Sequence, residues 1–271
     1  MHRVLAPRRE RRGGLKRTLV IAAAGTSTRF SRSLGRDVYK ILYHEGPETD
    51  CLLGWQLALA RGAGFDRVLI VGGHAYPDLC AYVQRHGGGG PPVATVFNEH
   101  YRDRGTCWSF VCGVAALPPD GADEIVFMEG DLMVDAASLA AVAAAERDVV
   151  TAARDPIRAD KSVAFYRTPD GRLRYIYDPA HRELRVDGPF TLLGNSGQVW
   201  KFRDPDRLRR TVAAPGPASH DDTNLAPIMA YFNAGPPDGI DFITFQDWFN
   251  CNTVEDYRQV RAYLHKGKTH A

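Results

Sequence analysis

Residues 19–30 read LVIAAAGTSTRF, in which an apolar run leads into a turn of small residues and then a basic side chain. Residues 19–23 have the length and apolar content of a central β-strand. Small side chains let the backbone N–H groups of the turn approach an anion closely, and the start of the following helix adds the positive end of its dipole. We therefore predict an anion-binding turn made of Ala23, Ala24, Gly25, Thr26 and Ser27.

Two basic residues follow this turn. Arg29 and Lys40 are predicted to supply full positive charges to the β- and γ-phosphates of a nucleotide. The turn lacks the Gly-x-Gly-x-x-Gly pattern of a Rossmann dinucleotide site, and it also lacks the Walker A pattern, so neither site is predicted. An ordinary strand-to-helix turn is the alternative explanation of the whole stretch.

Outward from this stretch, short apolar runs alternate with longer segments of helical period through the first half of the chain. Such alternation predicts a parallel sheet covered by helices. The predicted strands are residues 19–23, 67–71, 93–97, 124–128 and 148–152. The predicted helices, with apolar residues three or four apart, are residues 51–63, 76–85, 106–117 and 136–147.

After Ala153 the pattern changes to shorter, alternating strands. Residues 163–167 and 172–177 are joined by Thr-Pro-Asp-Gly, a turn sequence typical of a β-hairpin. Further elements are expected as strands at 190–193 and 198–202 and as helices at 206–212, 222–232 and 254–264. The fold class is therefore α/β, with a mixed, mostly parallel sheet flanked by helices and a small added β-rich region.

The net charge of +2 hides an uneven distribution. The first seventeen residues hold seven Lys or Arg residues and one Glu, so the rest of the chain carries a net charge of −4. A mildly acidic body argues against nucleic acid as a partner, because binding to a phosphate backbone needs a basic face. We predict that residues 1–17 form a disordered, solubilising basic tail, with contact to nucleic acid or an anionic surface as the alternative.

No apolar run reaches the roughly 18 residues that a membrane-spanning helix needs, so no membrane partner is expected. No apolar segment follows the arginines of the tail, so a secretory signal is not predicted. The five cysteines are scattered and lack Cys-x-x-Cys spacing, which predicts reduced thiols and no zinc site. A cytoplasmic location is expected, and a homodimer is left open.

Acidic residues follow the fourth predicted strand, in Glu129-Gly130-Asp131 and at Asp135. The carboxyl edge of a central strand is where α/β sheets bind ligands. Mg²⁺ binds one or two carboxylates together with phosphate oxygens and waters, so Asp131 is predicted to be its principal ligand. For Glu129 and Asp135 the alternatives are a strand-end charge and a helix N-cap.

Three segments, in this order along residues 19–257, resemble the GT-A-like nucleotidylyltransferases. Residues 22–40 resemble their Ala-Ala-Gly-x-Gly-x-Arg motif with its later lysine, where Gly25, Arg29 and Lys40 take the matching positions. Gly-Asp-Leu at 130–132 resembles the strand-end aspartate of that family. Residues 252–257 resemble its closing Asn/Asp-Thr-x-x-Asp-Leu motif, in which Thr253 caps the last helix. The resemblance covers nearly the whole chain after the tail.

The resemblance implies a Rossmann-like GT-A nucleotidyltransferase fold over residues 18–271. It implies one domain, with a nucleotide-binding half (18–153) and an acceptor-binding half (154–271). It also implies that Asn252 is a second ligand of Mg²⁺, and a capped terminal helix without further role is the alternative for this segment. The sequence departs from the family pattern at Ser27, Tyr39 and Asn252, where glycine, proline and often aspartate are usual.

Residues 97–110 resemble the Asn-x-x-Tyr…Ser-Leu segment of the phosphocholine and aminoethylphosphonate cytidylyltransferases, which implies CTP as the nucleotide. The implied nucleotide-binding residues are Asn98, Thr106, Ser109 and Glu129. Trp108 and Phe110 are predicted to be core residues of the helix.

Residues 193–202 resemble the acceptor-side glycine segment of the same family. By this resemblance Lys161 steadies the phosphorus group of the acceptor. The implied acceptor-binding residues are Asn195, Ser196, Tyr177 and Asp222. An aromatic cage for phosphocholine is the alternative use of Tyr175, Tyr177 and Trp200, and so is plain cover of the sheet.

The prediction from the whole sequence is a CTP-dependent nucleotidylyltransferase. It joins CMP to a small phosphonate, or to a phosphocholine-like phosphate, and releases pyrophosphate. A sugar-1-phosphate nucleotidylyltransferase that uses another triphosphate is the nearest alternative. A catalytically inactive nucleotide-binding module is the alternative from another class of protein.

Overall fold

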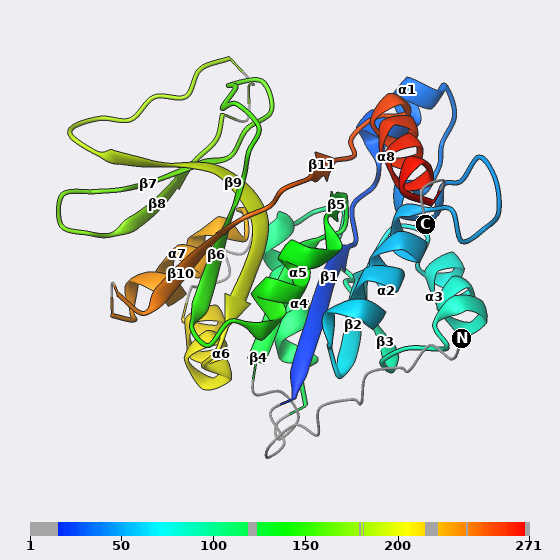
Figure 1. Ribbon diagram of the computed structural model, residues 1–271, viewed down its shortest axis with the longest axis horizontal. Coiled ribbons are helices and arrows are strands. Elements are labelled where there is room, and N and C mark those ends of the chain that lie inside the picture. Colours follow the sequence, from blue (N-terminus) through cyan, green and yellow to red (C-terminus); the bar gives the residue numbers. More distant parts are fainter. Residues whose placement is uncertain are drawn as a thin grey trace, which may run out of the picture.

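The computed structural model describes residues 16–118, 124–178, 180, 182–214, 222–236 and 238–268. The predicted basic tail, residues 1–17, therefore lies almost wholly outside the described residues. The described chain forms three layers, with a twisted central sheet between two layers of helices (Figure 1). None of its described helices is long and apolar enough to cross a membrane.

The central sheet has the strand order β10-β6-β9-β4-β1-β2-β3. The hairpin β7–β8 pairs with the outer part of β9, and β5 forms a separate two-stranded sheet with β11. The strands are β1 (Arg17–Ala23), β2 (Arg67–Gly72), β3 (Val93–Phe97), β4 (Glu124–Glu129), β5 (Leu132–Val134), β6 (Asp148–Ala153), β7 (Ala164–Arg167), β8 (Leu173–Ile176), β9 (Thr191–Phe202), β10 (Ile240–Thr244) and β11 (Trp248–Asn250).

Strand β1 lies at the centre, parallel to β2 on one side and to β4 on the other. Its register places Ala22 opposite Glu129, so the turn that follows β1 begins beside the end of β4. Strand β9 runs antiparallel between β4 and β6. The sheet is thus mixed and mostly parallel, and the predicted fold class is confirmed.

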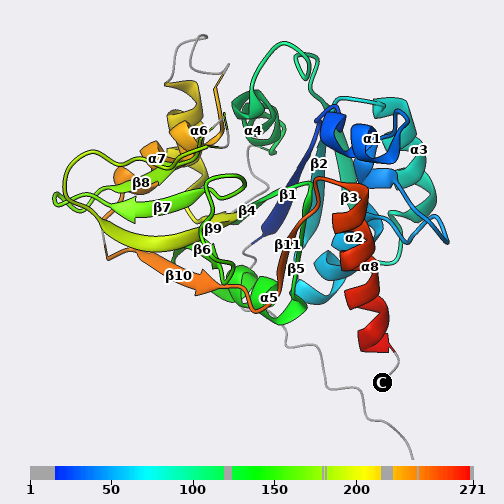
Figure 2. The ribbon, with the colours of Figure 1, turned by 90° about the horizontal axis from the view of Figure 1, so that it is seen from above.

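Helices cover both faces of the sheet (Figure 2). One apolar core joins the sheet to α2, α5 and α8, and a second joins its other face to α4, α6 and α7. The helices are α1 (Thr28–Leu34), the 3₁₀ turn η1 (Lys40–Leu42), α2 (Leu52–Ala63), α3 (Tyr76–His86), α4 (Thr106–Ala115), α5 (Ala136–Ala144), α6 (Pro205–Ala213), α7 (Leu225–Asn233) and α8 (Val254–Lys268).

One part of the predicted strand pattern was wrong. Residues 190–193 and 198–202 were expected as two strands, but β9 is a single strand of twelve residues. The gap expected between them, residues 194–197, lies inside this strand. Asn195 and Ser196 pair with β6, and the register then shifts at a bulge that begins at Gly197. Strands β5, β10 and β11 were not predicted.

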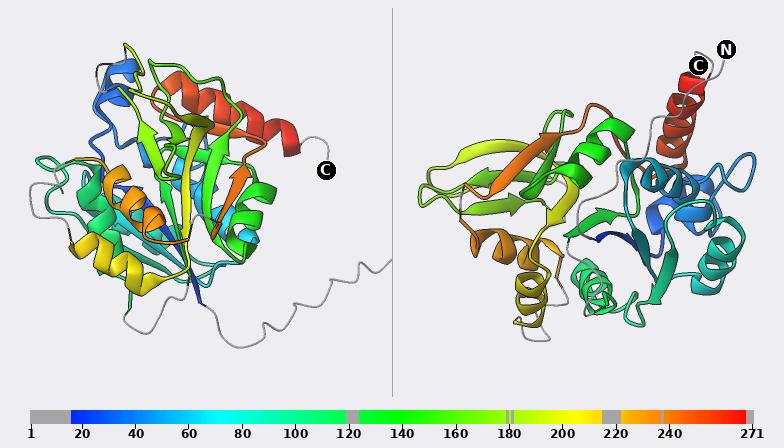
Figure 3. Two further views of the ribbon diagram at one scale, coloured as in Figure 1. Left: turned by 90° about the vertical axis from the view of Figure 1, so that its left-hand side faces the viewer. Right: turned by 60° about the horizontal axis from the view of Figure 1, so that its bottom comes forward.

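The carboxyl ends of the parallel strands form one functional edge of the molecule. Helices α1 and α8 and the hairpin β7–β8 lie at the same end of the sheet as this edge (Figure 3). Strand β11 runs between them and pairs with β5, directly after the end of β4. Segments far apart in the sequence are thereby brought around the turn after β1.

A buried ion cluster lies at the opposite end of β4. The carboxylate of Glu124 contacts Lys201 Nζ at 2.9 Å, Arg17 Nε at 2.8 Å and Arg203 Nε at 2.9 Å. Lys201 is fully buried and also donates to the carbonyl oxygens of Ala143 and Ala145 at 2.9 and 2.6 Å. This cluster fastens the amino ends of β1 and β4 to β9 and to the end of α5.

Candidate functional site

The turn after β1 has the backbone shape that a glycine would normally supply. Ser27, the N-cap of α1, has φ 59° and ψ 24°, in the left-handed region. This region costs a residue with a Cβ roughly 1–2 kcal/mol. The Ser27 hydroxyl accepts a hydrogen bond of 3.0 Å from the backbone N–H of Lys40, which offsets part of that cost. Serine therefore holds the glycine conformation at this position.

Tyr39 explains the second departure from the family pattern. Its hydroxyl donates a hydrogen bond of 2.5 Å to the carbonyl oxygen of Ala23, at the end of β1. Burial raises the pKa of Tyr39, so the hydroxyl stays a donor. Through Tyr39 and Ser27, the segment that carries Lys40 is fastened to both ends of the turn.

Gly130 brings the end of β4 against the end of β1. Its N–H donates to the carbonyl oxygen of Ala22 at 2.8 Å, and a Cβ at this position would lie 2.3 Å from that oxygen. Only glycine allows this approach. The next residue, Asp131, is thereby placed beside the turn, and one of its carboxylate oxygens lies 3.0 Å from Lys40 Nζ.

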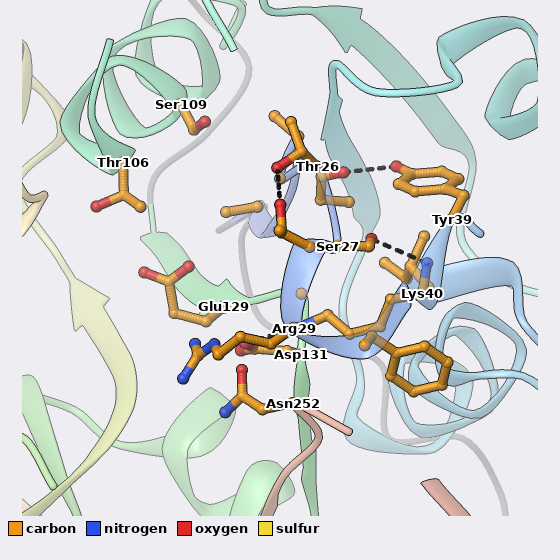
Figure 4. A pocket seen from close by; sticks show the side chains of 18 residues that line it. Thr26, Ser27, Arg29, Tyr39, Lys40, Thr106, Ser109, Glu129, Asp131 and Asn252 are labelled. Atoms are coloured by element: carbon orange, nitrogen blue, oxygen red, sulfur yellow. Dashed lines mark hydrogen bonds and ion pairs between the residues drawn. The ribbon is translucent and has the colours of Figure 1, made fainter. Parts of the chain in front are cut away.

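These residues line one cavity of about 350 Å³ (Figure 4). The turn contributes its whole length, from the end of β1 to the start of α1. The lining residues are Ala22, Ala23, Ala24, Gly25, Thr26, Ser27, Thr28, Arg29, Phe30, Tyr39, Lys40, Ile41, Thr106, Ser109, Glu129, Gly130, Asp131 and Asn252. A Cβ at Gly25 would meet no atom within 4 Å, so the space above the turn is open.

Glu129 lies at the last position of β4 and faces this cavity. Its carboxylate accepts a hydrogen bond from the side-chain amide of Asn224. Desolvation, and next to it repulsion by Asp131, raises the pKa of Glu129 to about 8. Glu129 is thus a half-buried, hydrogen-bonded group at the wall of the cavity.

The last part of the chain closes the cavity from the side of α8. The backbone N–H of Cys251 donates to the carbonyl oxygen of Asp131 at 2.8 Å. The amide nitrogen of Asn252 donates to Asn250 Oδ1 at 2.6 Å, so the amide oxygen of Asn252 is left for another partner. In Figure 4 this oxygen points toward Asp131.

Two predicted caps are confirmed. Thr253 Oγ1 accepts from the N–H of Asp256 at 3.2 Å, and the Asp256 carboxylate accepts from the N–H of Thr253 at 2.8 Å. This reciprocal pair is a capping box at the start of α8. Asp135 Oδ1 accepts from the N–H of Ser138 at 2.8 Å and caps α5. Asp135 is thus a cap rather than a site residue.

Two further compartments, of about 290 and 190 Å³, adjoin this cavity on the side of β9 and β11. Arg29 and Asn252 line all three spaces, so they stand where the compartments meet. Lys161 lines the two added compartments. Among the described residues, neither Arg29 nor Lys161 has a carboxylate partner.

Three residues that were predicted to bind the nucleotide or the acceptor form hydrogen bonds within the protein instead. Asn98 is fully buried, and its side chain bonds to Ser109 Oγ at 3.0 Å and to the N–H of His100 at 2.9 Å. Asn98 therefore positions Ser109 rather than facing the cavity. Ser196 is also fully buried, and its hydroxyl accepts from the N–H of Gln198. Asp222 is exposed, and its carbonyl oxygen accepts from the N–H of Cys107 at the start of α4.

The other predicted acceptor residues line the added compartments. Tyr177 lines the larger one. Asn195 lines the smaller one, is 5% exposed, and has a buried side-chain oxygen without a hydrogen-bond partner among the described residues. A buried polar atom of this kind is normally satisfied.

The aromatic residues considered in the sequence analysis differ in how deeply they are buried. Trp200 is 1% exposed and donates from Nε1 to the hydroxyl of Tyr175 at 2.7 Å, so these two rings belong to the core and do not form a cage. Phe110 is fully buried, as predicted. Trp108 was expected in the core, but it is half-buried, with its ring under the Arg104 guanidinium at 4.4 Å and beside His100. Polar neighbours in the loop before α4 hold it at the surface.

The residues of the site that reasoning from the sequence missed include Asn224, Gln198 and Asn250. Asn224 immediately precedes α7, and Asn250 ends a three-residue strand, so both resemble ordinary element boundaries. Gln198 was the first residue of the strand predicted at 198–202, and Gly197 directly before it was the one local signal of a bulge.

The donor set at the end of β4 suits a hard cation. No group of three or more His, Cys, Asp or Glu in the described ranges is placed to hold a metal ion. Mg²⁺ does not need such a group, because it binds through one or two protein oxygens together with phosphate oxygens and waters. Asp131 and the amide oxygen of Asn252 meet this requirement on one wall of the cavity.

A family model described as "Domain of unknown function (DUF6564)" matches residues 36–264. The chain belongs to this family. The match covers Lys40, Asp131 and Asn252 of the DUF6564 chain and begins after its Gly25 turn. No curated protein matches the sequence.

Solved structures share the fold of this DUF6564 protein. The inositol-1-phosphate CTP transferase from T. maritima superposes with a TM-score of 0.65 at 16% identity, over 90% of this chain and 92% of that one. The CTP:phosphocholine cytidylyltransferase from Streptococcus pneumoniae gives 0.60 at 14% identity, over 92% and 100%. A UDP-glucose pyrophosphorylase complexed with UDP-glucose gives 0.66 at 15% identity, over 94% and 100%. The predicted nucleotidyltransferase fold is confirmed.

Proposed function

We propose that this protein is a nucleotidylyltransferase that transfers CMP from CTP to a small phosphonate or phosphate acceptor and releases pyrophosphate. One observation carries the proposal: the turn after β1 and the acid after β4 line a single cavity of about 350 Å³. That cavity offers backbone N–H groups, two cations and a carboxylate to one polyphosphate. The nucleotidyltransferases that share the fold support the same reaction class.

In the proposed complex, the pyrophosphate part of CTP lies on the Gly25 turn. Residues 24–27 offer backbone N–H groups, and Arg29 and Lys40 neutralise the charge of the leaving group. Ser27 and Tyr39 hold the Lys40 segment against the turn, so these donors are fixed before the substrate arrives. Fixed donors stabilise developing charge without reorganisation at the moment of reaction.

The attacking group is an oxygen of the acceptor phosphonate. It forms a bond to the α-phosphorus of CTP, while the bond from the α-phosphorus to the bridging oxygen of pyrophosphate breaks. Phosphonates are largely anionic near neutral pH, so no general base is needed, and catalysis consists of positioning and charge neutralisation. Arg29 and Lys161 border the compartments from which the acceptor would approach.

Asp131 and Asn252 would hold Mg²⁺ in this scheme. The ion would supply positive charge at the α-phosphate. Asp131 must then exchange its contact with Lys40 for the cation, which frees the Lys40 ammonium for phosphate oxygens.

The preference for CTP rests on the resemblance of residues 97–110 to cytidylyltransferases. Thr106 and Ser109, at the start of α4, line the cavity, and Asn98 fixes Ser109 from behind. Two of the proteins with the same fold use CTP by their names. The proposal places the nucleotide in the half formed by residues 18–153 and the acceptor in the half formed by residues 154–271.

The test is pyrophosphate release by the full-length protein with Mg²⁺. Each of CTP, UTP, GTP and dTTP is combined with 2-hydroxyethylphosphonate, 2-aminoethylphosphonate, phosphocholine and glucose 1-phosphate. The proposal expects release with CTP and a phosphonate or phosphocholine. Release only with another triphosphate and glucose 1-phosphate would establish the sugar-phosphate alternative. Tight CTP binding without release across the panel would establish an inactive binding module.

A further inference from the structure

The bulge in β9 carries Gln198, a residue without a role in the proposed reaction. Opposite Thr151, β9 has three residues, Gly197, Gln198 and Val199, between its pairings with Ala152 and Val150. Gln198 has φ 53°, one of three positive φ values at residues other than glycine among those described. Such conformations cluster at ligand-binding sites, where the surroundings enforce them.

Three side chains form hydrogen bonds with the backbone of the bulge. Thr151 Oγ1 donates to the Val199 carbonyl at 2.6 Å, Trp248 Nε1 donates to the Gly197 carbonyl at 2.9 Å, and Ser196 Oγ accepts from the Gln198 N–H at 3.1 Å. The strained backbone of Gln198 is thus fixed from three directions. Its own side-chain amide forms no hydrogen bond with any described residue.

Gln198 lines the 290 Å³ compartment on the acceptor side. The two cations of that compartment, Arg29 and Lys161, suit the phosphonate end of an acceptor. In the same compartment, the hydroxyls of Tyr177 and Thr223 likewise have no hydrogen-bond partner among the described residues. Besides its two cations, the compartment therefore offers neutral donors and acceptors.

This compartment offers few groups that could bind a cationic head group. Three carboxylates line the compartment, and each already has a partner. Asp131 contacts Lys40 Nζ at 3.0 Å, and Glu129 accepts from the side-chain amide of Asn224. Asp178 accepts from three backbone N–H groups, those of Ala180, Arg182 and Glu183, at 2.8, 2.6 and 2.9 Å. A quaternary ammonium needs exposed aromatic faces. Trp200 is 1% exposed, which leaves Tyr177 as the one partly exposed aromatic ring in the lining of this compartment.

We infer that Gln198 determines acceptor specificity by hydrogen-bonding an uncharged hydroxyl on the organic part of a small phosphonate or phosphate. This inference rests on the proposed function for the identity of the acceptor's phosphorus group. A neutral amide offers both a donor and an acceptor, which is the pairing that a hydroxyl needs. The bulge aims this amide into the compartment at the cost of backbone strain.

The test compares two ligands that differ by one hydroxyl. Equilibrium titration of the full-length protein gives the Kd of 2-hydroxyethylphosphonate and of ethylphosphonate, and it needs no turnover. We expect the hydroxylated ligand to bind about tenfold more tightly, as one buried hydrogen bond predicts. In Gln198→Leu the two Kd values become equal, while Gln84→Leu, on the exposed face of α3, keeps the wild-type ratio.

A second variant distinguishes the loss of the amide contact from a change in the backbone of the bulge. Gln198→Gly keeps the left-handed backbone without strain, so the fold is retained, and it removes the amide. Equal Kd values in Gln198→Gly support the contact, whereas a wild-type ratio there overturns it. The inference is also overturned if 2-hydroxyethylphosphonate does not bind, or if 2-aminoethylphosphonate or phosphocholine binds more tightly. Absence of pyrophosphate release, by contrast, refutes the proposed function and leaves these binding ratios as they are.

Discussion

The ammonium of Lys40 lies 3.0 Å from a carboxylate oxygen of Asp131, although 91 residues separate the two in the sequence. In the proposed reaction each group has another partner, since Lys40 faces phosphate oxygens and Asp131 faces Mg²⁺. The ion pair keeps both charges compensated while no substrate is bound. Substrate binding therefore exchanges one ion pair for two interactions, and both residues are open to direct tests.

Replacement of Asp131 by Ala removes the predicted principal ligand of the cation. We expect kcat to fall by at least about 100-fold, because charge stabilisation of this kind is worth that much in other enzymes. The fold should be retained with a lower midpoint of thermal unfolding, because Lys40, whose side chain is 17% exposed, loses its ion-pair partner. Asp78→Ala, on exposed α3, is the matched control with wild-type turnover. Wild-type turnover in Asp131→Ala would refute the role of this carboxylate.

Replacement of Lys40 by Met tests the proposed contact between the Lys40 ammonium and the pyrophosphate part of CTP. The KM for CTP should rise by about tenfold or more, because a charge-assisted bond to phosphate is lost. Lys40→Arg should restore part of the affinity, as it keeps the charge and changes the geometry. Steady-state kinetics with varied CTP give both numbers. An unchanged KM in Lys40→Met would show that the triphosphate does not reach this side chain.

Ser27 gives a stability test that is independent of turnover. Ser27→Ala loses the hydrogen bond to the Lys40 N–H but keeps the Cβ in the left-handed region, and it should be destabilised by about 1 kcal/mol. Ser27→Gly loses the same bond and also relieves roughly 1 kcal/mol of strain, so it should unfold close to the wild type. Urea unfolding of both variants measures the difference. Equal stability of the two variants would contradict the left-handed backbone at Ser27.

The ion cluster of Glu124 predicts acid sensitivity. Burial raises the pKa of Glu124, but the bonds from Arg17 and Lys201 outweigh it, so the pKa lies below the ordinary value of 4.5. Because the folded pKa is lowered, this stabilisation is complete above pH 4.5 and is lost as the pH falls through the folded pKa. Glu124→Gln leaves Lys201 without its counterion and should cost about 3 kcal/mol at neutral pH.

Urea unfolding between pH 7 and pH 3 checks this expectation. The difference in stability between the wild type and Glu124→Gln should shrink as the pH falls below 4.5. A difference that stays constant over this range would mean that Glu124 is not held ionised by its neighbours.

Asn252 tests the second ligand of the cation. Asn252→Asp adds a negative charge beside Asp131, so the Mg²⁺ concentration that gives half-maximal turnover should fall, by about tenfold. Asn252→Ala should raise it. The dependence of pyrophosphate release on Mg²⁺ measures both shifts. If neither variant changes the requirement for Mg²⁺, Asn252 closes the cavity without touching the cation.

Much of the fold could be predicted because the central strands are short apolar runs with strong local signals. Strand β3 was predicted at its observed bounds, and β1, β2, β4 and β6 to within two residues. Strands β5, β10 and β11 were missed for a physical reason. Two of them have three residues each, and β10 is an edge strand with half-exposed residues, so their pairing depends on distant partners rather than on local pattern.

The residues of the site differ in the same way in how well local sequence patterns predict them. Gly25, Arg29, Lys40 and Asp131 lie next to strands with clear signals, and the structure brings all four to one cavity. The roles assigned to these residues stay predictions until they are tested. Asn98 has the right neighbourhood but the opposite orientation, which residue type alone does not reveal. Gln198 depends on a bulge held by Thr151 and Trp248, two residues far away in sequence, so the neighbouring Gly197 alone could not reveal its place in the site.

The pairing of β11 with β5 also has a consequence for biosynthesis. Asn252 and the N–H of Cys251, which bonds to Asp131, follow β5 by more than a hundred residues in order of translation. A ribosome-bound chain that ends before residue 248 can assemble the sheet around β1 but lacks this wall of the cavity. The cavity is therefore complete only after residue 252 has been synthesised, and a shorter nascent chain lacks the amide oxygen of Asn252 beside Asp131.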